Sequence, residues 1–74
     1  LQIMHIAIQH ILLDLSSVRD FEFDDNENLF TIEIRFWNSS LWDITLNYRD
    51  KQDRDKDLTR AKAALKVYWE NDDL

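Results

Sequence analysis

The sequence contains no cysteine, no glycine and no proline among its 74 residues. Without cysteine, the chain can form neither disulfides nor metal sites built on thiolates. Without glycine, it cannot build the glycine-rich loops that cradle phosphate groups. Because glycine and proline usually occupy turns, we expect asparagine, aspartate and serine to form the turns of this chain.

Basic residues and long apolar runs are also scarce. Nine Lys and Arg residues stand against fifteen Asp and Glu residues, which gives a formal net charge of −6. Concentrated Lys and Arg bind nucleic acids, so this balance argues against a nucleic-acid binder and favours a protein partner with a basic surface. No run is long enough to span a membrane, and the first residues lack a signal-peptide pattern. We therefore expect a cytoplasmic protein without a membrane partner.

The composition is that of a folded chain, with 45% hydrophobic and 12% aromatic residues. Its length predicts a single small domain over residues 1–74. A chain this short buries only about 60% of its unfolded surface, so its core is marginal. Close packing or assembly into a homo-oligomer must then supply the remaining stability.

The first segment is ambiguous between helix and strand. Apolar residues at helical spacing, together with the length of the segment, favour a helix over residues 1–15. These residues are Leu1, Met4, Ile8, Ile11, Leu15 and Val18. The alternative is a strand with Met4, Ile6 and Ile8 on one face and His5, Ala7 and Gln9 on the other. The abundance of β-branched isoleucine favours that alternative.

Three alternating segments predict strands over residues 18–24, 29–37 and 41–48, separated by polar turns. The last two should form an antiparallel hairpin with one apolar and one polar face. The side chains expected to face inward are Phe21, Phe23, Phe30, Ile32, Ile34, Phe36, Trp42, Ile44, Leu46 and Tyr48.

A charged run over residues 49–57 leads into a second predicted helix. Leu58, Ala61 and Leu65 share one face of that helix with Tyr68. Acidic residues suit a helix start, so the expected caps are Asp53, Asp55 and Asp57. The expected order is helix, three antiparallel strands and helix, an α+β two-layer sandwich with both helices on one sheet face.

No motif predicts catalysis, a cofactor or a metal. Residues 53–57 begin like a calcium loop, but Leu58 and Ala64 stand where that loop needs glycine and glutamate. His5 and His10 are five residues apart, whereas a zinc pair on one helix needs a spacing of three or four. The serines all fall in expected turns, so we expect a non-enzymatic protein without cofactors.

Two groups of residues are candidates for binding a partner. An acidic strip follows the first strand and its tip: Asp20, Glu22, Asp24, Asp25 and Glu27. The alternative for this strip is a solvated edge that discourages aggregation. Trp37 is expected on the polar sheet face with Leu41 near it, and tryptophan is enriched in interface hot spots. Trp37 could equally fold over the sheet edge.

The order helix, three strands, helix resembles a double-stranded RNA-binding domain. Residues 30–35 look like that family's second strand, and residues 60–65 are similar to its last helix. The family's RNA-contacting loop contains Gly, Pro and His, whereas residues 25–28 here are Asp-Asn-Glu-Asn. Its lysine cluster is replaced by bases interleaved with aspartate. The resemblance therefore implies a degenerate module used for protein contact or weak nucleic-acid binding.

The residues together favour a non-enzymatic protein-interaction domain. Its expected forms are a small acidic inhibitor or immunity-type protein, of the kind carried by phages and mobile elements, or an obligate homo-oligomer. The alternative nucleic-acid module would use Arg49, Lys51, Arg54, Lys56 and Arg60.

Overall fold

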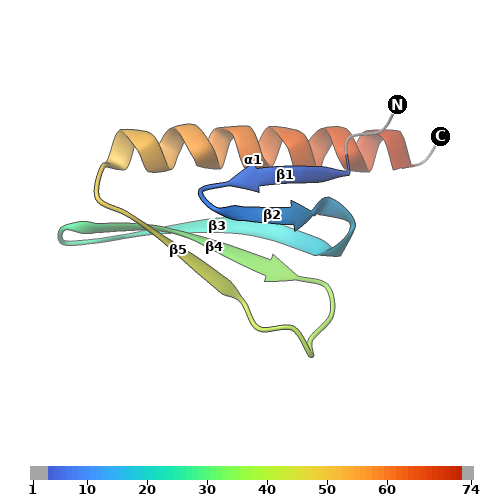
Figure 1. The fold of residues 1–74 in the computed structure, drawn as a ribbon, viewed down its shortest axis with the longest axis horizontal. Helices are drawn as coiled ribbons and strands as arrows, with labels where there is room; N and C mark the ends of the chain where they lie inside the picture. The colour runs from blue at the N-terminus through green and yellow to red at the C-terminus, as the bar shows by residue number, and fades with distance from the viewer. Residues whose placement is uncertain (1–3, 73–74) are drawn as a thin grey trace.

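The structure, a computed structural model, describes residues 4–72 and contains five strands and one α-helix in that range (Figure 1). In chain order the elements are β1 (His5–Ile8), β2 (Ile11–Asp14), the short 3₁₀ helix η1 (Leu15–Ser17), β3 (Val18–Asn26), β4 (Leu29–Phe36), β5 (Ile44–Tyr48) and α1 (Lys51–Asp72). β1 pairs with β2, and β3, β4 and β5 form a second antiparallel sheet in that order.

The predicted N-terminal helix is wrong, because a β-hairpin occupies its place. The part of that prediction on residues 1–3 lies outside the described residues. β1 and β2 pair from His5 opposite Asp14 to Ile8 opposite Ile11. Burial alternates along β1, with Ile6 and Ile8 buried and the residues beside them exposed, as the strand alternative predicted. The predicted helix–sheet–helix sandwich is therefore also wrong, since only one α-helix lies within residues 4–72.

The two tightest turns have residues other than asparagine, aspartate and serine at their first position, although the second turn lies within the predicted polar turn over residues 25–28. Two-residue turns join β1 to β2 and β3 to β4, and their first residues, Gln9 and Glu27, have φ of 53° and 47°. Positive φ at this position normally belongs to glycine. The expectation that asparagine, aspartate and serine make the turns is therefore wrong at these two positions. It holds at Asn38, whose backbone carbonyl accepts a hydrogen bond from the Leu41 amide at 2.9 Å.

The three predicted strands of the larger sheet are present with shifted ends. Phe21, Ile32, Ile34, Leu46 and Tyr48 point to the core, as their alternation predicted. β5 begins only at residue 44, so the predicted strand over residues 41–48 is too long. Trp42 consequently lies outside the ladder and is 90% exposed, which contradicts its predicted place in the core. Phe23 is also 54% exposed.

Helix α1 lies along the long axis of the molecule and contacts every strand of the larger sheet (Figure 1). The side chain of Asp50 accepts a hydrogen bond from the Gln52 amide at 2.8 Å and so caps its first turn. The helix thus begins before the expected caps at residues 53, 55 and 57. Its predicted apolar face is correct: Leu58, Ala61 and Leu65 are buried.

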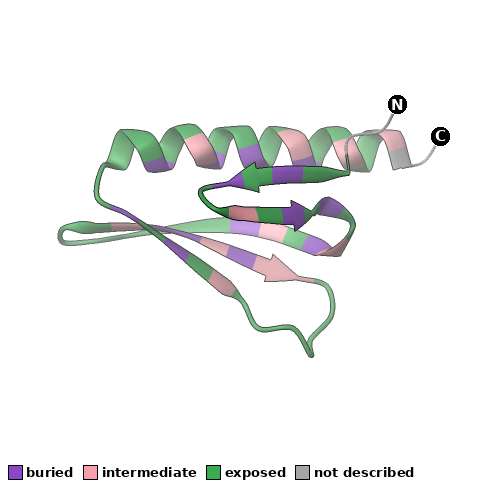
Figure 2. Ribbon diagram, in the orientation of Figure 1, coloured by how far each residue is buried: buried purple, intermediate pink, exposed green. Residues whose placement is uncertain are grey.

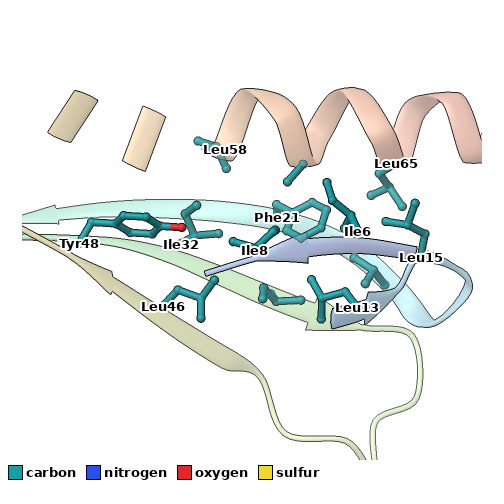
Figure 3. Packing of buried hydrophobic residues seen from close by; sticks show 13 residues of the cluster. Ile6, Ile8, Leu13, Leu15, Phe21, Ile32, Leu46, Tyr48, Leu58 and Leu65 are labelled. Atoms are coloured by element: carbon teal, nitrogen blue, oxygen red, sulfur yellow. The ribbon is translucent and has the colours of Figure 1, made fainter. Parts of the chain in front are cut away.

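The core lies between the larger sheet on one side and α1 with the β1–β2 hairpin on the other. Figure 2 shows the buried positions on the side of the helix that faces the strands. In the close view of Figure 3, Leu58 and Leu65 of α1 lie on the strand-facing side of the helix, and they belong to the same buried cluster as Ile6 of β1 and Phe21 of β3. Both covering elements therefore lie on one sheet face, and no other element of residues 4–72 covers the opposite face of the larger sheet, which we call the open face.

No helix within residues 4–72 combines the length and the apolar character needed to cross a membrane.

Candidate interaction surface

Most of the charged side chains on the open face of the larger sheet are carboxylates. The cross-strand rows on this face are Asp20–Arg35, Glu22–Glu33–Thr45 and Asp24–Thr31–Asn47. We call these residues the acidic face. Its paired rows contain four carboxylates and one guanidinium, so the alternation of acidic and apolar residues along β3 places a negative surface opposite the core.

Arg35 neutralises part of the acidic face. Its Nε donates to Asp20 Oδ1 at 2.7 Å, and its Nη2 donates to Glu22 Oε1 at 3.0 Å. The hydrogen bond to Asp20 raises the pKa of Arg35 above its ordinary value. These two contacts hold the carboxylates of Asp20 and Glu22 in fixed positions on the sheet.

Glu33 lies opposite Glu22 in the strand pairing, and like charges in that position destabilise a sheet. Arg35 bridges to Glu22, but no basic side chain among residues 4–72 forms an ion pair with Glu33. Asp24 is exposed, and it too has no basic partner in the described part of the chain. The acidic face therefore keeps uncompensated charge that a basic partner would neutralise.

The predicted acidic strip is divided between the two sides of the sheet. Asp20, Glu22 and Asp24 lie on the acidic face. Asp25 lies on the helix side, where its Oδ1 is 2.6 Å from Nη2 of Arg54. Glu27 is an exposed residue of the β3–β4 turn. Three of the five predicted acids are therefore brought together, and the other two are not.

Arg54 is a buried structural residue that sequence reasoning assigned to a charged run. Its side chain is 1% exposed, and its guanidinium lies 5.0 Å from the ring centre of Phe23 and 5.7 Å from that of Phe30. Nη1 donates to two backbone carbonyls of the β3–β4 hairpin, Asp24 O at 3.1 Å and Thr31 O at 3.3 Å. The guanidinium thus joins the start of α1 to this hairpin.

Acidic neighbours keep the buried guanidinium of Arg54 charged. Its Nε donates to Asp55 Oδ1 at 2.8 Å, in addition to the contact with Asp25. Burial alone favours the neutral form, but the hydrogen bonds to Asp55 and Asp25 outweigh it, so the pKa of Arg54 is raised. One signal could have found it: Arg54 precedes the buried positions 58, 61 and 65 at helical spacing.

An apolar loop extends from one end of the sheet, away from α1 (Figure 1). We call residues 37–43 the tryptophan loop. Trp37, Leu41 and Trp42 are 62%, 47% and 90% exposed. Asn38 fixes the turn, since its side chain accepts a hydrogen bond from the Ser40 amide at 2.9 Å. Trp37 and Leu41 therefore lie at the surface, and Trp42 joins them there unexpectedly.

The remaining candidate side chains have structural or solvent-exposed positions. His5 and His10 are both exposed, on β1 and in the turn that follows it. Asp57 accepts a hydrogen bond from the Tyr48 hydroxyl at 2.8 Å and so links α1 to β5. The hydroxyl of Ser16, in η1, donates a hydrogen bond to the side chain of Asp14. Within residues 4–72, no three His, Asp or Glu side chains gather to hold a metal ion.

Comparisons with known protein families, with curated proteins and with solved structures find no match to this chain. The resemblance to double-stranded RNA-binding domains also loses its first helix, because β1 and β2 occupy that segment.

Proposed function

We propose that this chain is a non-enzymatic protein-interaction domain whose acidic face binds a basic surface on another protein. The observation that carries the proposal is the open sheet face, on which Glu33 and Asp24 have no basic partner within residues 4–72. Neutralising such charge at an interface gives specificity and a fast approach of the partner. A small acidic inhibitor or immunity-type protein is the form of interaction domain that this surface suits.

The tryptophan loop supports the same function. It leaves the sheet directly after β4, the strand that carries Glu33 and Arg35. In protein interfaces, exposed tryptophans supply apolar anchors and charged residues supply a polar rim. A basic partner could therefore contact the carboxylates and Trp37 or Trp42 at once.

The alternative function, a nucleic-acid-binding module, has weaker support, because three of its five basic side chains are engaged within the domain. Arg54 is buried. Lys51 lies 3.8 Å from Asp25, and Arg60 donates to the Ala7 carbonyl at 2.7 Å. Only Arg49 and Lys56 of the predicted set remain without such contacts in the described part of the chain.

The test compares charge removal on two surfaces. The immobilised domain is incubated with a lysate of the organism that encodes it, and bound proteins are eluted with salt. We expect the wild type to retain a basic protein that Asp24→Asn/Glu33→Gln releases. Asp53→Asn/Glu70→Gln removes the same charge from exposed positions of α1 and should retain it. With the purified partner, the first variant should slow association by about 3–10-fold at low salt.

Equal retention by the two charge variants would refute the acidic face as the binding surface. If the domain captures only further copies of the chain, it self-associates and the proposed binding of a different partner is wrong.

A further inference from the structure

One edge of β3 is free. Within residues 4–72, this strand pairs only with β4. The pair Asn26–Leu29 closes the two-residue turn, so hydrogen-bonded and non-hydrogen-bonded pairs alternate back from it. That alternation directs the backbone N–H and C=O groups of Phe21 and Phe23 away from β4. No other backbone segment within residues 4–72 hydrogen-bonds to them, so they can pair with an added strand.

A groove lies beside this edge. A hollow of about 280 Å³ lies between β3 and the second half of α1. Its lining residues are Asp20, Phe21, Glu22, Lys62, Leu65 and Trp69. Most of its surface is apolar, and Trp69 is 44% exposed at its wall. A free strand edge beside an apolar groove can bind an extended peptide as an additional strand.

Charged residues lie on each side of the edge. Side chains of an added strand alternate, so one set would continue the acidic face beside Asp20, Glu22 and Asp24. The other set would enter the groove beside Leu65 and Trp69, where Lys62 disfavours another base. The edge is thus suited to a strand in which basic and apolar residues alternate.

The β3 edge of a second copy does not meet this requirement. Antiparallel pairing of two β3 edges centred on Glu22 would place Glu22 opposite its own copy and Asp20 opposite Asp24. Like charges directly opposite each other destabilise a sheet.

We propose that the free edge of β3 binds an extended segment of the partner protein, with basic residues over the acidic face and apolar residues in the groove. The inference rests on the proposed function, since it specifies how the basic partner is held.

The test uses an acetylated and amidated peptide of four Lys-Val repeats. Its control has the same composition in the order Lys-Lys-Val-Val, which lacks the two-residue period. We expect the alternating peptide to bind the full chain at least 10-fold more tightly in an NMR titration. Hydrogen exchange at the Phe21 and Phe23 amides should slow by at least 10-fold at saturation, because these amides gain hydrogen bonds.

Two matched pairs of variants test the location. Lys62→Glu and Lys56→Glu change the net charge equally, but only position 62 lines the groove. We expect Lys62→Glu to tighten peptide binding about 3–10-fold, and Lys56→Glu to change it less than 2-fold. Phe23→Pro removes the outward amide that Phe23→Val retains, so only the proline variant should lose binding.

The exchange measurement uses the wild-type protein, so it holds even if Phe23→Pro does not fold. Unchanged exchange at Phe21 and Phe23 in the bound state, equal affinity for both peptides, or no binding at millimolar peptide would overturn the edge inference. A failure of the proposed function would give a different result: the wild type and Asp24→Asn/Glu33→Gln would retain the captured partner equally.

Discussion

Replacing Arg54 by alanine should strongly destabilise the domain, although the residue belongs to a charged segment. The substitution removes two hydrogen bonds to hairpin carbonyls and two to carboxylates, and it removes the contacts of the guanidinium with the rings of Phe23 and Phe30. Breaking a buried ion pair costs about 3–5 kcal/mol when the remaining charge stays buried.

Here the remaining carboxylates can regain water, because the side chains of Asp25 and Asp55 are 41% and 52% exposed. We therefore expect a loss of about 2–4 kcal/mol in the free energy of unfolding. A domain of this size has a total stability of roughly 4–11 kcal/mol, so the loss is a large share of it. Arg54→Lys keeps the charge but not the planar fork, and should lose about 1–2 kcal/mol.

Urea unfolding followed by far-UV circular dichroism measures the difference. The control is Arg19→Ala, since Arg19 is 45% exposed and its ion-pair contact with Asp20 is 3.7 Å. A surface pair of this kind contributes at most about 1 kcal/mol. If Arg54→Ala unfolds at the same urea concentration as Arg19→Ala, the guanidinium does not hold α1 to the hairpin, and the reasoning is refuted.

Two further predictions concern a turn and a tyrosine. Glu27→Gly should stabilise the domain by about 1 kcal/mol in the same urea assay, because glycine tolerates the positive φ of 47° at this position; a loss of stability would contradict it. Burial and the hydrogen bond to Asp57 raise the pKa of Tyr48 above that of an unfolded tyrosine. The neutral Tyr48 side chain therefore contributes its full stability below about pH 10, and this contribution is lost as the pH rises above that value. Tyr48→Phe should therefore flatten the alkaline fall in stability, and an equal slope in both proteins would exclude this linkage.

The larger sheet was predictable because its alternation is regular. Inward positions in β4 recur every second residue from Phe30 to Phe36, and such a pattern fits only a strand with one buried face. The buried face of α1 was predictable for the same reason, since Leu58, Ala61 and Leu65 repeat at helical spacing.

The N-terminal hairpin was not predictable from periodicity alone. Inward positions at 6, 8, 11, 13 and 15 combine strand spacing with one step of three across the turn. Together with neighbouring apolar residues, this mixture imitates the three- and four-residue steps of a helix. The turn itself, Gln9-His10, lacks the glycine or asparagine that usually marks a hairpin.

The candidate surface was predictable only in part. Alternation along β3 correctly grouped Asp20, Glu22 and Asp24, but it also directs Asp25 to the opposite side. Helical spacing places Arg54 in line with the buried residues of α1, but its role required knowledge of the tertiary contact between α1 and the β3–β4 hairpin. Trp42 was misplaced because β5 starts two residues after it.

The position of α1 after all the strands has a consequence for the order of folding. Each strand pair joins neighbours in the sequence, so every hairpin can form from local contacts. The hydrogen bond from Arg60 to Ala7, by contrast, closes a loop of 53 residues. On a ribosome, the strands emerge before the helix that covers their apolar face. We expect the part of the nascent sheet that α1 covers to remain unprotected, and open to chaperones, until the second half of α1 has left the exit tunnel.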